Sequence, residues 1–273
     1  RQGGIEILVF ELINDASNIE CVAVNRKNFF PALSIGHFGI ESQKNVKAAI
    51  FGLPLDNVQS LNLISYARNF DLYSFKFPHL ALPFKDKVSS VPEMLFSKII
   101  EIDRKLKASS SLNKLEDCEP VEANSCNFAG AFKKPVTQGS YYAVYGHTLN
   151  TTTGKKLRLN EDIFWLTAAD SEIVAPSEGK IEGFENRHLT LNYGCGLRSH
   201  LYPVDLIRIT VGDKFYKGQV LGQTARSSSE FIGHQYSLWG HPINNRELED
   251  ERWFVDHIIK KLIFINDVVG LKK

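Results

Sequence analysis

The sequence lacks the short motifs by which many metal and nucleotide sites are recognised. Its histidines form no His-x-His or His-Glu-x-x-His, and its cysteines form no Cys-x-x-Cys. There is also no Gly-x-Ser-x-Gly, P-loop or dinucleotide-binding glycine motif. A local chelating pair is therefore excluded, although distant residues can still assemble a metal site.

The chain also lacks a charge excess and long hydrophobic runs. Its formal net charge is +1, whereas surfaces that follow nucleic-acid phosphates are strongly basic, so we expect no nucleic-acid partner. No apolar run approaches the roughly 20 residues that cross a bilayer. The sequence begins at Arg1 rather than Met, which leaves open a leader or an N-terminal membrane anchor ahead of it.

The chain has only four cysteines, and their spacing matches no zinc motif. Cys21 and Cys195 are isolated, while Cys118 and Cys126 flank a polar, loop-like stretch. An oxidising compartment would permit a local disulfide between Cys118 and Cys126. Whether that disulfide forms is left open.

The first third of the chain is a succession of short β-type runs. IEILVFEL, ECVAV, VKAAIFGL and LNLISYA are rich in Val, Ile and Phe, and turn-forming residues separate them. Their close spacing predicts a small antiparallel β-sandwich, which we place at residues 1–88.

Residues 89–131 are predicted to be a helix followed by a linker. Ser90 and Glu93 are spaced as a capping box, and Pro92 suits a first-turn position. Apolar residues then recur at helical spacing, at Leu95, Ile99, Ile102 and Leu106. The polar stretch that follows has the composition of a linker.

The rest of the chain is predicted to be a second β domain with a terminal helix. Many glycines between short β-type runs favour a compact, coiled antiparallel sheet over residues 132–246. Residues 247–273 return to helical spacing, with Asp250 as a cap. The expected fold class is therefore mainly β.

Residues 146–240 resemble the LytM/lysostaphin-type family of peptidoglycan zinc endopeptidases. The most specific segment is ITVGDKFYKGQVLGQT, which matches the family's Val-x-x-Gly-Asp-x-Val-x-Lys-Gly-Gln-x-Ile-Gly. DIFWLTAADSEIVAPSEGKI, LTLNYGCGLRS and IGHQYSLWGHPIN match other family segments in the same order. The resemblance implies a LytM-like coiled antiparallel sheet for this domain.

The resemblance also implies where a zinc site would lie. In the family, a His and an Asp four residues later bind zinc together with the second His of a His-x-His. The first His of that pair and a loop His assist catalysis. Matched without gaps, the metal positions fall on Asn160, Phe164 and Tyr236, and the catalytic histidine positions fall on Pro203 and His234.

The side chains at these metal positions are poor zinc ligands. Phe164 cannot ligate a metal, Asn160 is a poor ligand, and Tyr236 would have to lose a proton whose pKa is near 10. A match shifted by one residue, onto Leu159 and Ile163, is no better. The resemblance therefore implies a pseudo-endopeptidase that has no catalytic residues and binds no zinc.

Such a protein is expected to act by binding. The resemblance implies an exported protein of the periplasm or cell envelope of a bacterium, which regulates wall remodelling during cell division or in setting cell shape. Its expected partners are peptidoglycan or a cell-wall hydrolase, either an amidase or a catalytic LytM-type relative.

Two alternatives remain open. In an active metallopeptidase with a rebuilt site, His200, His234 and a carboxylate such as Asp162 or Asp205 would have to converge. In a simple peptidoglycan-binding module, aromatic side chains would line a groove, because their faces stack on sugars and peptides. The candidate groove residues are Trp165, Tyr202, His234, Tyr236 and Trp239.

Overall fold

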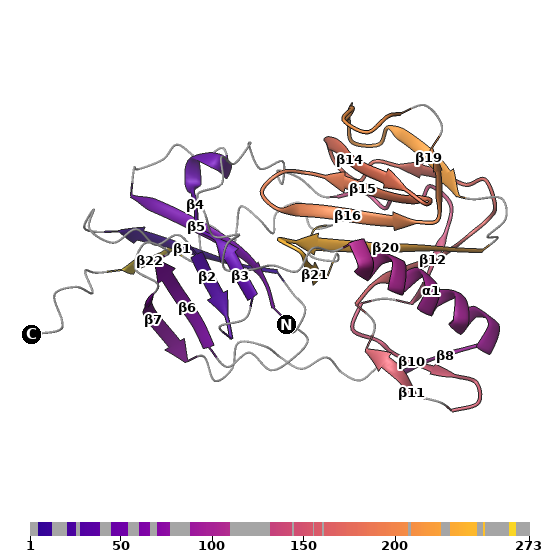
Figure 1. Ribbon diagram of the computed structural model, residues 1–273, viewed down its shortest axis with the longest axis horizontal. Coiled ribbons are helices and arrows are strands. Elements are labelled where there is room, and N and C mark those ends of the chain that lie inside the picture. Colours follow the sequence, from indigo (N-terminus) through magenta and orange to yellow (C-terminus); the bar gives the residue numbers. More distant parts are fainter. Residues whose placement is uncertain are drawn as a thin grey trace, which may run out of the picture.

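The protein is mainly β, as the sequence predicts, and the described part of the chain contains one α-helix (Figure 1). No helix in this part is long and apolar enough to cross a membrane. The computed structural model describes residues 5–12, 21–25, 28–38, 45–53, 60–65, 70–76, 88–109, 132–143, 145–154, 156–159, 161–206, 209–224, 230–244, 248 and 262–265.

The N-terminal part forms two four-stranded sheets, and most of their buried side chains belong to the largest apolar cluster of the protein, which continues into the C-terminal part. The first sheet has the order β22 (Leu262–Ile265), β1 (Ile5–Leu12), β5 (Val46–Gly52) and β4 (Leu33–Ser34). The second has the order β3 (Asn28–Pro31), β2 (Cys21–Val24), β6 (Ser60–Ser65) and β7 (Phe70–Lys76). A short 3-10 helix, η1 (Ile35–Phe38), follows β4.

The end of the chain returns to this sandwich as a strand. β22 pairs with β1 in parallel, from Val9 opposite Leu262 to Leu12 opposite Ile265. The helix predicted for residues 247–273 is therefore wrong at these four positions. The apolar run LIFI completes a sheet edge, and such tertiary pairing overrides a helical spacing of apolar residues. Apart from Leu248, the remainder of this segment lies outside the described residues.

The C-terminal part is built on one eight-stranded sheet, in which β21 (His241–Ile243) pairs with β20. Its other strands have the order β18 (Lys214–Phe215), β14 (Gly179–Glu185), β15 (His188–Asn192), β16 (Leu197–Tyr202), β20 (Glu230–Leu238), β12 (Ile163–Thr167) and β9 (Ser140–Ala143). A smaller sheet has the order β13 (Glu172–Val174), β19 (Val220–Thr224) and β17 (Val204–Leu206). A third has the order β11 (Lys156–Leu159), β10 (Thr148–Thr151) and β8 (Val88–Val91).

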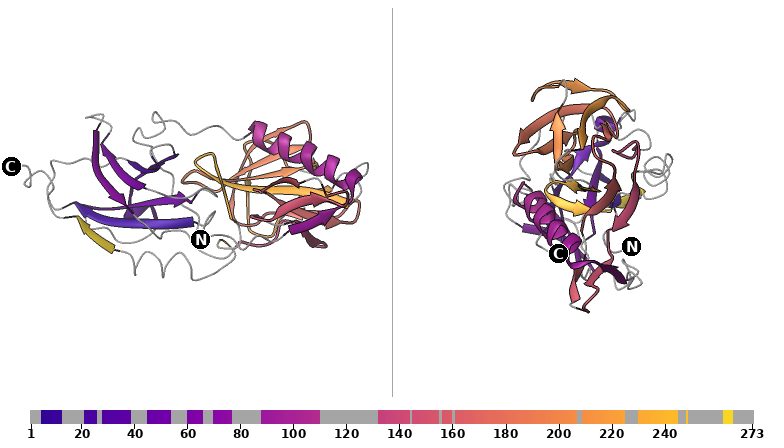
Figure 2. Two further views of the ribbon diagram at one scale, coloured as in Figure 1. Left: turned by 90° about the horizontal axis from the view of Figure 1, so that it is seen from below. Right: turned by 90° about the vertical axis from the view of Figure 1, so that its right-hand side faces the viewer.

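The two faces of the large sheet have different coverings, because side chains alternate along each strand. One face shares a core with the smaller sheet β13-β19-β17, in which Trp165 packs with Ile173 and Leu221. The helix α1 (Glu93–Ser109) lies across the other face (Figure 2). We call these the core face and the helix face.

Helix α1 starts close to the predicted position, but without the predicted capping box. The amide of Phe96 donates to the carbonyl of Pro92 at 2.9 Å, so helical hydrogen bonding begins there. Ser90 belongs to β8 and is paired with Asn150 of β10. The Glu93 carboxylate instead accepts a hydrogen bond from the Thr153 hydroxyl at 2.9 Å. Strand pairing has thus removed Ser90 from the helix start.

Cys21 and Cys195 are both disulfide-bonded, although both are isolated in the sequence. No free cysteine occurs among the residues that the structure describes. Cys118 and Cys126, for which a local disulfide was left open, lie outside these residues.

Candidate functional site

The register between β12 and β20 decides which side chains share a face. Ile163 lies opposite His234, and Phe164 lies opposite Gly233. Directly opposed residues of an antiparallel pair point to the same side of a sheet. Phe164 therefore belongs to the helix face, whereas His234 points to the core face.

His234 and Tyr236 are part of the core. The Tyr236 ring lies 5.6 Å from the Phe132 ring and 4.4 Å from the His234 ring, measured between centroids. Only 1% of His234 is exposed, and neither of its ring nitrogens has a hydrogen-bond partner among the described residues. Burial, with a smaller effect of the nearby His200, lowers the pKa of His234 to about 3. His234 is therefore a neutral core residue, out of reach of solvent.

The two described metal positions consequently do not face one pocket. Phe164 and Tyr236 point to opposite faces of the sheet, and one metal ion needs its ligands on the same side. The core face is closed by the smaller sheet. On the helix face, Gly233 lies opposite Phe164, and Gln235 follows on the same face. Each stands one position before the residue that the sequence match selected, His234 and Tyr236.

Of the other two predicted positions, the structure describes only Pro203. Asn160 lies outside the described residues. Pro203 is buried at the end of β16, after a cis peptide bond with Tyr202.

On the helix face, α1 fills the space over Phe164 and Gly233. A Cβ atom placed on Gly233 would lie 2.2 Å from Cγ2 of Ile102 and 3.2 Å from Cδ1 of Leu106. Glycine alone permits the helix to approach the strand this closely. Ile102, Leu106 and Phe164 are buried in one apolar cluster, which also contains Val91, Ile99, Ala143, Leu149 and Phe231.

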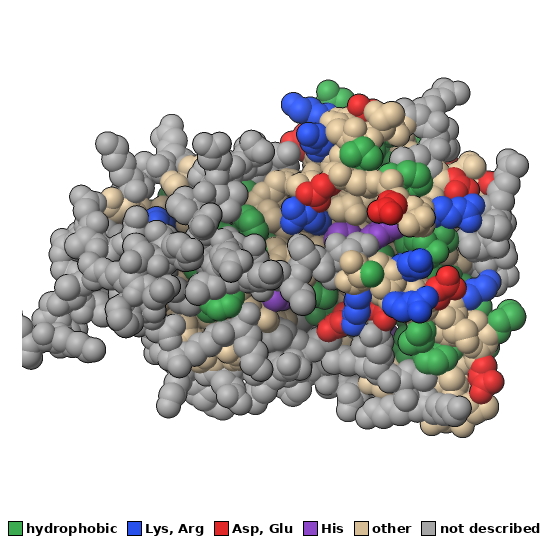
Figure 3. Space-filling view, viewed as in Figure 1, with side chains coloured by type: hydrophobic (Ala, Val, Ile, Leu, Met, Phe, Trp, Pro, Cys, Tyr) green, Lys and Arg blue, Asp and Glu red, His purple; other side chains and the backbone are tan. Residues whose placement is uncertain are grey.

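A row of buried polar side chains runs beside this apolar cluster. Nε2 of His200 lies 3.1 Å from the Ser237 hydroxyl, and Nδ1 lies 3.4 Å from the Thr190 hydroxyl. The Gln235 amide donates to the Asp162 carboxylate at 2.6 Å. Figure 3 shows histidine side chains on this side of the molecule, among residues of both charges.

The histidines of this row are uncharged at neutral pH. Burial, assisted by the charges of His188 and Arg198, lowers the pKa of His200 to about 3. Burial also lowers the pKa of His188 to about 4. Their rings lie 5.4 Å apart, so protonation of one would disfavour protonation of the other.

Two buried carboxyl groups join α1 to the sheet. Asp103 of α1 and Asp162 are both buried and in hydrogen-bond contact. Burial raises the pKa of Asp162 well above its usual value, and Asp103 raises it further, while Gln235 and Lys107 act in the opposite direction. Asp162 therefore retains a proton to higher pH than an exposed aspartate, because two adjacent buried carboxylates would repel each other.

We expect the substitution Asp162→Asn to raise the free energy of unfolding at pH 8. A raised folded-state pKa stabilises below the unfolded pKa, and this contribution is lost as the pH rises. The asparagine side chain keeps an oxygen that accepts the hydrogen bond from Gln235. It does not ionise, so the stability that Asp162 loses at high pH is retained. Urea unfolding at pH 8 and pH 4 measures the free energy of unfolding of both proteins, and Glu161→Gln is the control at a neighbouring carboxylate. A lower stability of Asp162→Asn at pH 8 would contradict the expectation.

The residues proposed for a rebuilt metal site do not converge. His200 lies on the helix face and His234 on the core face, because His200 is paired with Gln235. Asp205 forms an ion pair with Arg187 at 3.1 Å. Among the residues that the structure describes, no three or more His, Cys, Asp or Glu side chains lie close enough to hold a metal ion.

The predicted aromatic groove is not assembled either. Trp165 is fully buried in the core and packs on Tyr141, with ring centroids 4.1 Å apart. His234 and Tyr236 are buried in the same core. Trp239 packs against this core, whereas Tyr202 packs against the cluster under α1. These five side chains thus offer no common surface to a ligand.

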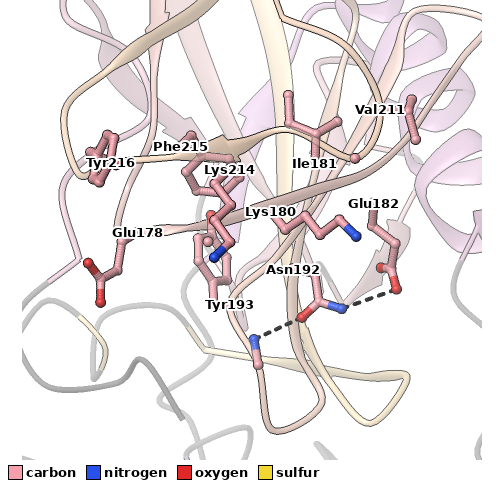
Figure 4. Close-up of a pocket in the computed structure, with 13 residues that line it drawn as sticks. Glu178, Lys180, Ile181, Glu182, Asn192, Tyr193, Val211, Lys214, Phe215 and Tyr216 are labelled. Carbon is pink, nitrogen blue, oxygen red and sulfur yellow. Dashed lines mark hydrogen bonds between the residues drawn. The ribbon is translucent and has the colours of Figure 1, made fainter. Parts of the chain in front are cut away.

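The structure shows an open pocket that the sequence did not indicate. It has a volume of about 840 Å³ and lies beside β14 and β18 (Figure 4). Its lining includes Lys180, Glu182, Asn192, Lys214 and Tyr216. Charged residues at these spacings look like an ordinary exposed strand, so only the pairing of β14 with β18 could have revealed it.

The fold is similar to those of solved M23 (LytM/lysostaphin-type) peptidases. A candidate M23 peptidase of Pseudomonas aeruginosa has a TM-score of 0.50 and 18% identity, over 94% of this chain and 95% of its own. Csd3 of Helicobacter pylori has a TM-score of 0.37 and 14% identity, over 49% of this chain and 41% of its own. A zinc-containing peptidase of Vibrio cholerae has a TM-score of 0.35 and 12% identity, over 44% and 38%.

The similarity to the Pseudomonas aeruginosa protein extends over nearly the whole of both chains, and it is a similarity of fold. No protein-family profile matches the sequence, and no curated protein does. The chain therefore has the mainly β fold seen in M23 peptidases.

Proposed function

We propose that this protein is a non-catalytic LytM-like protein of the bacterial envelope, which binds peptidoglycan or regulates an enzyme that remodels it. The observation that carries the proposal is the packing of α1 on the helix face. Ile102 and Leu106 lie where a side chain at position 233 would have to project. A metal ligand cannot stand there while the helix is in place.

The residues on this face do not assemble a zinc site. His200 and Asp162 also lie here, but no three His, Cys, Asp or Glu side chains come together among the described residues. Protein zinc sites use His, Cys, Asp or Glu ligands. Phe164 has no donor atom, Gly233 has no side chain, and Gln235 uses its amide to donate to Asp162. We therefore derive no hydrolytic step through a metal, and we place the function in binding.

The partners remain those that the resemblance implied: peptidoglycan, an amidase or a catalytic LytM-type relative, acting in cell division or cell shape. The two disulfide-bonded cysteines, Cys21 and Cys195, support an exported protein, because structural disulfides persist in oxidising compartments. The M23 fold supports a wall-associated role by analogy.

Metal analysis and a sacculus-cleavage assay on the purified full chain test the proposal. We expect less than stoichiometric zinc, no release of soluble wall fragments, and retention either on sacculi or on a wall hydrolase. Retention on sacculi alone identifies a simple binding module. Tightly bound stoichiometric zinc together with cleavage would overturn the proposal and restore the metallopeptidase alternative.

A pair of zinc-restoring variants tests the register of the helix face. Both carry Asn160→His and Phe164→Asp, with Ile102→Ala and Leu106→Ala to make room under α1. We expect zinc uptake when Gln235→His is added, because Gln235 is on the same face as Phe164. We expect none when Tyr236→His is added instead. Zinc content of the folded proteins measures both, and uptake by the Tyr236→His protein alone would contradict the register.

A further inference from the structure

Two lysines face each other across the pocket strands. Lys180 of β14 is directly opposite Lys214 of β18 in an antiparallel pair. Such residues have Cβ atoms about 5 Å apart on the same face, and like charges at this position destabilise a sheet. Both side chains line the pocket (Figure 4). The fold thus places two lysines side by side on one face, an arrangement that repulsion between like charges disfavours.

Neither lysine is neutralised within the described part of the chain. No ion pair or hydrogen bond is made by the amino group of Lys180 or Lys214 there. Glu182 is already engaged by Arg198, at 2.6 Å and 2.9 Å, and by the Asn192 amide at 3.2 Å. Glu178 is the remaining acidic residue of the lining, so the two lysines leave an excess of positive charge.

The rim of the pocket is apolar and exposed. Tyr216 is 72% exposed and Val211 is 56% exposed, although most large apolar side chains of this domain are buried. Figure 4 shows both at the edge of the pocket, with the lysines between them. An exposed tyrosine ring can pack on the face of a sugar or on a peptide. The pocket therefore combines two central cations with apolar contacts for the rest of a larger ligand.

We propose that this pocket binds an oxyanion, a carboxylate or a phosphate group, carried by a polymer of the cell wall. The anion would lie between Lys180 and Lys214 and remove their mutual repulsion, so that the binding energy includes the relief of an unfavourable pair. Tyr216 and Val211 would contact the sugar or peptide that carries the anion. The choice of a wall polymer rests on the proposed function, whereas the oxyanion site follows from the lysine pair.

Calorimetric titration of the full chain tests the site with three probes. These are a soluble muropeptide with free carboxylates, the same muropeptide with its carboxylates amidated, and inorganic phosphate. We expect Lys180→Ala and Lys214→Ala each to weaken binding of the anionic probe at least tenfold. Lys217→Ala removes an exposed lysine of the same hairpin outside the pocket lining, and should bind like the unchanged protein.

The variant Lys180→Glu separates binding from folding. It replaces a like-charge pair by an opposite-charge pair, so the protein should resist heat at least as well as the unchanged protein. The same variant should lose binding of the anion. Tyr216→Ala should weaken binding of the muropeptide but not binding of inorganic phosphate, because only the larger ligand reaches the rim of the pocket.

The outcomes are distinct. Loss of muropeptide binding on amidation assigns the site to carboxylates, and binding of phosphate alone assigns it to phosphate. Equal binding by Lys180→Ala, Lys214→Ala and Lys217→Ala, or no binding of any probe, overturns the proposed site. A zinc-free protein that still binds sacculi after Lys180→Glu would overturn the site and leave the proposed function intact.

Discussion

The substitution Gly233→Ala is expected to lower the free energy of unfolding by about 2 to 3 kcal/mol. The added Cβ atom would lie 2.2 Å from Cγ2 of Ile102, which no real contact allows, and 3.3 Å from Cε1 of Phe164. Because β20 is a central strand, the helix must shift away from the sheet rather than the strand from its neighbours. Urea unfolding measures the loss.

The matched control is Gly183→Ala. Gly183 also lies in a strand of the large sheet, but its nearest neighbour to an added Cβ atom is Cβ of Thr190 at 3.9 Å. Alanine should be neutral or slightly stabilising there, since it restricts the unfolded chain. Adding Ile102→Ala to the Gly233→Ala protein should recover part of the loss. Equal stability of the two alanine variants would show that α1 does not pack on Gly233.

The local elements could be predicted from the sequence because their signals are local. The run IEILVFEL became β1 with its predicted bounds, and the apolar face of α1 contains the predicted Ile99, Ile102 and Leu106. What that face covers could not be predicted. The contact depends on Gly233, which lies far along the chain and gives no sign of a helix above it.

The predicted metal positions in β12 and β20 differ from the strand pairing by one residue. A one-residue shift moves every side chain of a strand to the opposite face. The sequence match placed the metal-binding histidine of the pair on Tyr236, but the pairing of β12 with β20 places Gly233 opposite Phe164 and turns Tyr236 to the other face. His234 and Tyr236 looked like remnants of a ligand motif, and they are core residues. Strand pairing is a property of the folded protein, so the sequence pattern could not decide between adjacent positions.

The pocket was missed for a related reason. Lys180 and Lys214 are distant in sequence and sit in unremarkable polar stretches. Their opposition arises from the pairing of β14 with the two-residue strand β18. The resemblance to a family hairpin drew attention to its glycines and not to this pair. Two like charges can be recognised as directly opposed only when the pairing of the strands is known.

Acidification from pH 7 to pH 4 is expected to remove about 3 kcal/mol from the free energy of unfolding for each of His200 and His234. The folded-state pKa values of these two are lowered to about 3, mainly by burial. His188, whose pKa is lowered to about 4, acts in the same direction. The unfolded chain therefore binds more protons, and stability present above about pH 6.5 is lost as the pH falls. Asp162 acts in the opposite direction, because its pKa is raised. Since domains are stable by about 5 to 15 kcal/mol, acid should come close to unfolding this protein.

Two leucine variants separate this titration from packing. His234→Leu removes two buried ring nitrogens that have no partner in the part of the chain that the structure describes. It should therefore be as stable as the unchanged protein at pH 7, or more stable. His200→Leu should be less stable at pH 7, because Ser237 and Thr190 lose the ring that they contact. Both should reduce the steepness of the pH dependence by about one proton, since each removes one group that titrates only on unfolding. Chemical denaturation at half-unit intervals from pH 4 to pH 7 measures the slope. An unchanged slope in His234→Leu would mean that the ring is not buried in its neutral form.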